Sequence, residues 1–250
     1  YEITSKLPRF GLQDTILPHE INEFESLEGE AKAEAVSRKI ATILKEHKDD
    51  YMTTLEFMCV GALFGKVVDG SGKVLFEFRS TATPIEFKNK EIDIALNEID
   101  NALVDELGTE VPYEILCSNE FYNKVVAKAK TAGDFENKTA SYIDEDGTRI
   151  LVSHGKRFVP YRASYPDENG NTKKFLKANE AIVIPKSEKV YEVVYGRADH
   201  TEAVKVAPKM FFAATPQELE RGKGYAIDTE MKAMPYCTRP SALINLVFSN

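Results

Sequence analysis

Residues 31–64 read AKAEAVSRKIATILKEHKDDYMTTLEFMCVGALF and contain no proline. Side chains suited to burial recur in this stretch at steps of three or four, the spacing of one stripe on an α-helix. The stripe consists of Val36, Ile40, Ile43, His47, Tyr51, Leu55, Met58 and Ala62. Ser26 and Gly29 precede it, and Gly61 and Gly65 close it, as start and stop signals do. At about 1.5 Å per residue, one unbroken helix here would measure about 50 Å.

The same stretch leaves one alternative open. Asp49 and Asp50 could cap a fresh start, so either one rod or two collinear helices fit the pattern. In both cases the stripe needs a cover. We expect one sheet to provide it, built from the strands that follow the helix and from returning C-terminal strands, with 241–248 the best candidate.

The composition bounds the class of protein. The chain has 250 residues, of which 43% are apolar and 29% charged, which disfavours both disorder and a membrane protein. No apolar run approaches the length of a membrane span, and no basic-then-apolar start indicates a signal peptide. The net charge is −8, and this makes general binding of nucleic acid unfavourable because phosphate contacts need clustered Lys and Arg.

Residues 1–29 carry apolar side chains but no helical period. They include Pro8, Pro18 and the set Leu7, Phe10, Leu12, Ile16, Leu17, Ile21, Phe24 and Leu27. This pattern indicates an extended arm or hairpin whose apolar groups must be covered. The cover can be this chain's own body or a neighbouring subunit, and the sequence leaves both open.

The remaining chain alternates strands and helices, which predicts an α+β fold. A β-hairpin is expected over 66–78 around a glycine turn, helices over 91–107 and 120–131, and a buried strand over 113–117. The stretch 135–148 is polar and predicts a loop. Strands are expected at 150–152, 158–165, 175–184, 190–194, 204–206, 210–213 and 241–248, and a short helix or loop at 216–223. Asn169-Gly170 predicts a tight turn.

No stretch predicts a cofactor or metal site. Gly70-Ser71-Gly72-Lys73 resembles a phosphate loop, but Val67 and Val74 occupy positions that the motif reserves for Gly and for Ser or Thr. A hairpin turn fits better. The four histidines are scattered, and no Cys-x-x-Cys occurs, so the spacings of known metal sites are not met.

A catalytic cysteine is a formal alternative. Cys117 could pair with His154 in space, but a cysteine inside an apolar strand is far more often a packing residue. Cys59, Cys117 and Cys237 therefore predict buried thiols in a reducing compartment. Glu56 could form an interface salt bridge or be a solvated carboxylate.

The order of these segments resembles that of the major capsid proteins of tailed bacteriophages, in particular the lambda-type major capsid protein E family with the Hong Kong 97 fold. The resemblance covers nearly the whole chain. The chain departs from the family in one respect: members commonly carry tryptophan near the hairpin after the long helix and in the central domain, and this chain has none. The resemblance rests on the arm, the helix through Glu56 to Gly61-Ala62-Leu63-Phe64-Gly65-Lys66-Val67, the Asp69-Gly70 turn, Thr83-Pro84-Ile85, Val111-Pro112-Tyr113-Glu114-Ile115-Leu116, the strands within 158–184, and Pro235, Arg239-Pro240 and Leu246-Val247.

The resemblance implies a structural shell protein and no enzyme. It makes residues 1–30 an extended arm on the next subunit, 31–90 and 187–250 a peripheral domain with the long helix as spine, and 91–186 an axial domain. Copies would form hexamers and pentamers of a shell in the virion after assembly in the bacterial cytoplasm. Scaffold, portal and decoration proteins are further candidate partners, and double-stranded DNA would be enclosed without specific binding.

On this interpretation five residues are candidate contacts between subunits. They are Phe10, Leu12, Ile16, Leu17 and Glu56. The alternative is a soluble α+β enzyme or small-molecule-binding protein with a pocket between its layers. A measurement of particle size separates the two, because an enzyme forms a small defined oligomer and a capsid protein forms rings or shells.

Overall fold

The computed structural model describes residues 6–22, 30–78, 82–166 and 169–249. The chain forms two compact units, each made of two segments. Tyr1–Phe57 and Val193–Pro235 form unit 1, and Met58–Glu192 and Tyr236–Asn250 form unit 2. These boundaries differ from those expected for the peripheral and axial domains of a shell, which stay a prediction.

The stretch 31–64 lies almost entirely in one helix, α2 (Glu30–Leu63), with no break at Asp49-Asp50. It ends because Gly65 adopts a left-handed backbone with φ of 74°, a conformation that glycine takes without steric cost. Gly61 is fixed by a different constraint. A Cβ at this position would lie 2.5 Å from the Lys66 carbonyl oxygen, so the chain can turn back against the helix only where a side chain is absent.

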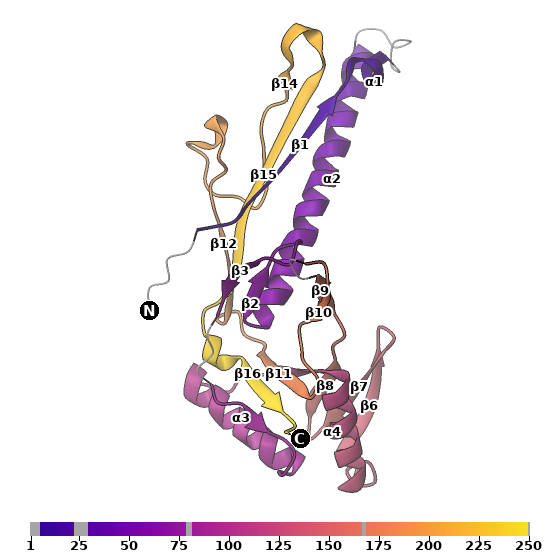
Figure 1. Cartoon of the computed structure of the whole chain (residues 1–250), viewed down its shortest axis with the longest axis vertical. Helices are drawn as coiled ribbons and strands as arrows, with labels where there is room; N and C mark the ends of the chain where they lie inside the picture. The colour runs from indigo at the N-terminus through magenta and orange to yellow at the C-terminus, as the bar shows by residue number, and fades with distance from the viewer. Residues whose placement is uncertain (1–5, 23–29, 79–81, 167–168, 250) are drawn as a thin grey trace. The chain divides into compact units, whose positions relative to one another are not determined.

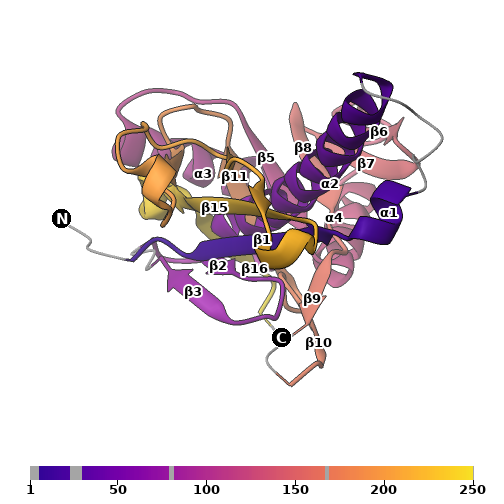
Figure 2. The same ribbon diagram turned by 90° about the horizontal axis from the view of Figure 1, so that it is seen from above.

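Unit 1 contains most of a five-stranded antiparallel sheet. Its centre is β15 (Tyr225–Cys237), which pairs with β1 (Arg9–Ile16), β12 (Tyr191–Tyr195), β13 (Phe212–Ala213) and β14 (Gln217–Glu218). Within this unit β1 and β15 run beside α2 (Figures 1 and 2). The short helices α1 (Pro18–Asn22), η1 (Thr201–Ala203) and η2 (Glu220–Gly222) lie in the connections.

Unit 2 is built on a seven-stranded mixed sheet. The strands lie in the order β4 (Ile85–Glu86), β16 (Ile244–Val247), β11 (Glu180–Pro185), β5 (Tyr113–Cys117), β8 (Lys156–Pro160), β7 (Thr148–Ser153) and β6 (Ala140–Glu145). The hairpins β2–β3 (Lys66–Val68, Val74–Glu77) and β9–β10 (Ser164–Pro166, Thr172–Lys174) are separate, and η3 (Pro240–Ala242) precedes β16.

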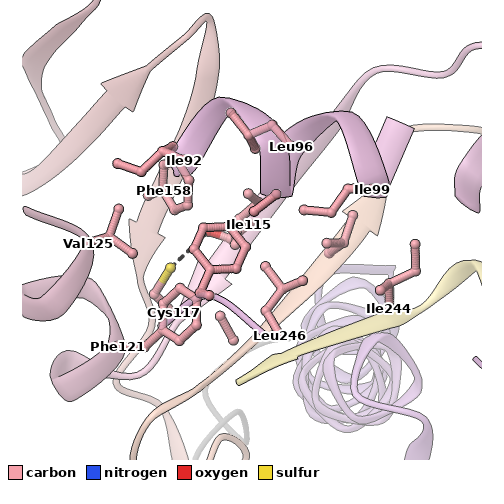
Figure 3. Packing of buried hydrophobic residues seen from close by; sticks show 14 of the residues in the cluster. Ile92, Leu96, Ile99, Ile115, Cys117, Phe121, Val125, Phe158, Ile244 and Leu246 are labelled. Atoms are coloured by element: carbon pink, nitrogen blue, oxygen red, sulfur yellow. Dashed lines mark hydrogen bonds between the residues drawn. The ribbon is translucent and has the colours of Figure 1, made fainter. Parts of the chain in front are cut away.

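The two faces of this sheet bury different clusters, as the alternation of side chains along a strand requires. One face packs under α3 (Ile92–Leu107) and α4 (Asn119–Thr131), where Ile115, Cys117 and Phe158 are fully buried (Figure 3). On the other face lie Ile182 and Leu243 with the rings of Phe64 and Phe78. α3 therefore covers one face of the sheet, and the segments that flank the β2–β3 hairpin contribute to the opposite face.

The described elements correct several sequence predictions. The expected loop at 135–148 contains strand β6, which pairs with β7 around the turn Asp146-Gly147. The expected strand at 204–206 is wrong, because this stretch follows η1 as a turn. The longest strand, β15, was not predicted at all. Its Asp, Glu and Lys residues and Pro235 are unfavourable for a strand, and its pairing with β1, β12, β13 and β14 stabilises it.

The stripe on α2 is confirmed along its second half. His47, Tyr51, Leu55, Met58 and Ala62 are each at most 7% exposed, while Val36, Ile40 and Ile43 are half-buried. A returning C-terminal strand does cover this part of the stripe, but it is β15 and not the predicted segment 241–248. β16 pairs with β4 and β11, and its Ile244 and Leu246 belong to the cluster under α3 and α4. His47 and Tyr51 instead contact β1 and β15.

Candidate assembly surfaces

A group of buried polar side chains fixes the N-terminal segment within unit 1. The Tyr51 hydroxyl accepts a hydrogen bond from the Leu12 amide and donates one to the Thr229 carbonyl, both at 2.9 Å. Leu12 and Thr229 face each other in the register of β1 and β15, so the tyrosine of α2 bridges the two strands. His47 adds contacts of 2.8 Å to Thr229 Oγ1 and 3.0 Å to Asp14 Oδ2.

A second polar group lies at the other end of β1. The Glu230 side chain is nearly buried, and its carboxylate accepts hydrogen bonds from Arg9 Nε at 2.7 Å and from the Asp199 amide at 2.8 Å. The bond to Glu230 raises the pKa of Arg9. Lys232 Nζ lies 2.6 Å from Asp199 and holds the pKa of that carboxyl below its usual range. Glu230 is therefore paired and hydrogen-bonded, as a buried charge must be.

The five predicted contact residues differ in exposure. Leu17 is 42% exposed and Glu56 is exposed, while Phe10 and Leu12 are half-buried. Ile16 is only 1% exposed, so its side chain packs inside its own chain and offers no surface to a neighbour. The arm is thus partly a strand of the chain's own sheet, in which Ile16 is buried while Phe10 and Leu12 keep part of their surface exposed. Residues 23–29 lie outside the described ranges.

The residues considered for chemistry are not assembled into a site. Cys117 is fully buried, its pKa is raised well above the usual value by burial, and its thiol contacts the Ile115 carbonyl at 3.6 Å. His154 contacts Ser153 instead. Asp69 accepts hydrogen bonds from the Ser71 and Lys73 amides, so Gly70-Ser71-Gly72-Lys73 forms a hairpin turn. Among the described residues, no group of three His, Cys, Asp or Glu could hold a metal ion.

An open groove of about 1040 Å³ lies on unit 2 between the β2–β3 and β9–β10 hairpins. Its apolar part includes the stacked rings of Phe64 and Phe175, with centroids 5.1 Å apart. Its charged part is basic, with Lys66, Lys173, Lys174 and Lys177 against Glu77 and Glu180. The sequence alone did not predict this groove. The adjacent lysines of β10 were the available signal, but the sequence does not show which elements they face.

The helix α3 presents the opposite charge. Its sixteen residues include Asp93, Glu98, Asp100, Asp105 and Glu106 and no Lys or Arg. Glu98 and Asp100 pair with Lys90 at 2.5 Å and Lys156 at 2.9 Å. Asp93 and Asp105 are exposed, and Ile94, next to Asp93, is 48% exposed. The outer face of α3 is therefore acidic with an apolar residue.

The comparison with protein families decides the class of this protein. The model for phage major capsid protein E matches residues 2–248. The chain belongs to this capsid protein family. The predicted family and the predicted α+β capsid fold of the Hong Kong 97 type are confirmed.

Individual relatives of this capsid protein are distant. The chain is 23% identical to the major capsid protein of Salmonella phage Felix O1, over 98% of this chain and 77% of that protein. Among solved structures it is similar to the capsid protein assigned to a prophage of Escherichia coli CFT073, with 14% identity, 98% and 78% coverage and a TM-score of 0.49. The mature capsid of bacteriophage PhiM1 gives 11% identity, 99% and 72% coverage and a TM-score of 0.45.

Membership in the capsid family establishes the general role. The protein is a structural head protein of a phage virion, and it acts by associating with copies of itself. It is not an enzyme, which decides against the alternative of an enzyme or small-molecule-binding protein. Within the described ranges, no helix has the length and apolar character that crossing a membrane requires.

Proposed function

We propose that this head protein forms the hexamers and pentamers of an icosahedral shell around double-stranded phage DNA, with its N-terminal segment lying on the neighbouring subunit. The match to capsid protein E over residues 2–248 carries this proposal. Interfaces in such a shell repeat by rotation around closed rings, so every subunit must offer two different complementary surfaces. Assembly takes place in the bacterial cytoplasm, with scaffold, portal and decoration proteins as further partners.

In this proposal residues 91–186 form the axial domain near the centre of each ring. Residues 31–90 and 187–250 form the peripheral domain, with α2 as its spine, and residues 1–30 form the arm. The division of the chain into two compact units supports these proposed domain bounds in part. All of 91–186 falls inside unit 2, and unit 1 consists only of arm and peripheral residues.

The arm contact is proposed to use Leu17, Phe10 and Leu12, with Glu56 as a polar contact on α2. Ile16 has a different role, because its buried side chain anchors the segment from which Leu17 projects. Each square ångström of apolar surface that the neighbour covers would contribute about 25 cal/mol. Leu17 is well suited to such a contact because the buried Ile16 already fixes the backbone beside it. Less conformational entropy is then lost when a neighbour covers Leu17.

The enclosed DNA needs little direct affinity for the shell. The net charge of −8 opposes tight binding of phosphates, and this suits a shell that must later release its contents. The proposal therefore includes no sequence-specific DNA contact.

A substitution at the exposed leucine tests the arm contact. Leu17→Asp is expected to leave the circular dichroism spectrum and the thermal transition unchanged, because the side chain is 42% exposed, and to abolish particles in light scattering and negative-stain electron microscopy. Val204→Asp is the matched control, since Val204 is also apolar and is 60% exposed. It should assemble as the wild type does. Normal particles from the folded Leu17→Asp variant would show that the arm contact is wrong.

A further inference from the structure

The groove and α3 carry opposite charge on opposite faces of one unit. Ile182 and Leu243, which line the groove, belong to the cluster on one face of the seven-stranded sheet. The buried side of α3 packs on the other face from Ile92 to Leu103, and Leu107 at the end of the helix also contacts the first cluster. In both views α3 and the β9–β10 hairpin lie on different sides of unit 2 (Figures 1 and 2). A surface pair placed in this way cannot close within one chain, but it can join successive copies head to tail.

The lysines of the groove are not confined to the edge strand β10. Lysines on an edge strand commonly serve to prevent pairing with other strands, and Lys173 and Lys174 on β10 fit that role. Lys66 lies outside β10, with its ammonium 5.8 Å from the centre of the Tyr165 ring. Lys177 lies beyond the hairpin, 4.0 Å from Glu180. Four lysines against two glutamates thus line one groove on a protein whose net charge is −8.

The acidic character of α3 is unfavourable for the helix itself. The negative end of the helix dipole lies at the C-terminus, where cations stabilise and carboxylates destabilise. The last turn of α3 nevertheless carries Asp105 and Glu106 and no basic residue, and the exposed Glu110 follows. Residues that break a local rule of stability are expected where a function requires them. Here they concentrate negative charge on an outer surface.

We infer that the outer face of α3 docks into the basic groove of the next copy of this chain. Asp105 and Asp93 approach the groove lysines, and the exposed Ile94 meets the aromatic part formed by Phe64 and Phe175. The ion pairs give the contact its register and the apolar residue gives it buried area, as in other protein interfaces. The inference rests on the proposed shell, for which it names a second contact besides the arm.

Charge reversal tests this contact. Lys174→Glu and Asp105→Lys each alter an exposed side chain, so Lys174→Glu should keep the wild-type thermal transition. Asp105→Lys should keep or slightly raise it, because it places a cation at the negative end of the helix dipole. Each alone places like charges opposite each other and should raise the protein concentration required for half-assembly by about tenfold or more. The double variant restores an attractive pair and should assemble within about threefold of the wild type. The exposed pair Lys130→Glu and Glu136→Lys is the control and should have no such effect.

The outcomes separate this inference from the arm proposal. Rescue in the double variant supports the contact, whatever the result for Leu17→Asp. Singles that are folded and assemble normally overturn it. A defect in Lys174→Glu that Asp105→Lys neither shares nor rescues also overturns it, because the groove would then receive a different acidic partner. Assembly that fails in Leu17→Asp and persists in all charge variants retains the arm contact alone.

Discussion

Replacing Tyr51 by Phe removes one oxygen atom and tests whether α2 holds β1 and β15 together. The Tyr51 hydroxyl is the hydrogen-bond partner of the Leu12 amide and the Thr229 carbonyl, both at 2.9 Å. The ring stays in place next to Phe211, 5.9 Å between centroids. A buried polar group that loses its partner costs about 1–3 kcal/mol. The Thr229 carbonyl incurs this cost fully and the half-buried Leu12 amide partly, so we expect a loss of about 2–4 kcal/mol.

Urea unfolding of the unassembled chain measures this loss as a lower midpoint at an unchanged slope. Tyr142→Phe is the control, because that side chain is 39% exposed and its change should cost less than about 0.5 kcal/mol. If Tyr51→Phe stays within that same limit, the tyrosine does not connect the strands and the reasoning fails.

The same residue gives a dependence on pH. Burial raises the pKa of Tyr51, so the folded state holds the phenolic proton more tightly than the unfolded chain does. The associated stabilisation is complete below about pH 10, where free tyrosine titrates, and is lost as the pH rises through the raised value. Unfolding curves between neutral and alkaline pH should therefore fall more steeply for the wild type than for Tyr51→Phe. Parallel curves would contradict this.

Three further predictions concern the helix and the thiols. Leu55→Ala should cost about 2–4 kcal/mol in urea unfolding because the side chain is 7% exposed, and the half-buried Ile43→Ala only about 1 kcal/mol; equal losses would contradict the observed burial. Gly61→Ala should destabilise by at least about 1 kcal/mol, although alanine favours helices, because its Cβ would lie 2.5 Å from a backbone oxygen; a gain in stability would show that the turn relaxes. Cys117 should resist thiol reagents in the folded protein, and its rapid labelling at neutral pH would refute this. Burial raises the pKa of Cys237 to about 11, so Cys237 should react slowly at neutral pH and faster as the pH approaches that value.

Local patterns in the sequence determined much of the architecture. The stripe at three- and four-residue steps predicted α2, and the buried positions from His47 to Ala62 follow it. The glycine turn of the β2–β3 hairpin, the helix ended by Gly108, and the strand Tyr113–Cys117 were equally predictable. These features depend on residues within a few positions of each other, so the sequence states them directly. The order of segments was sufficient to predict the family.

The tertiary structure decided what depends on distant residues. β15 is a strand because four other strands pair with it. One of these is β1, where Leu12 and Thr229 meet although they are 217 positions apart. The sequence also contains the lysines of β10 and the carboxylates of α3, but not their placement on opposite faces of one sheet. A helix is specified by its own period, whereas strand pairing and the faces of a sheet arise only when remote segments meet.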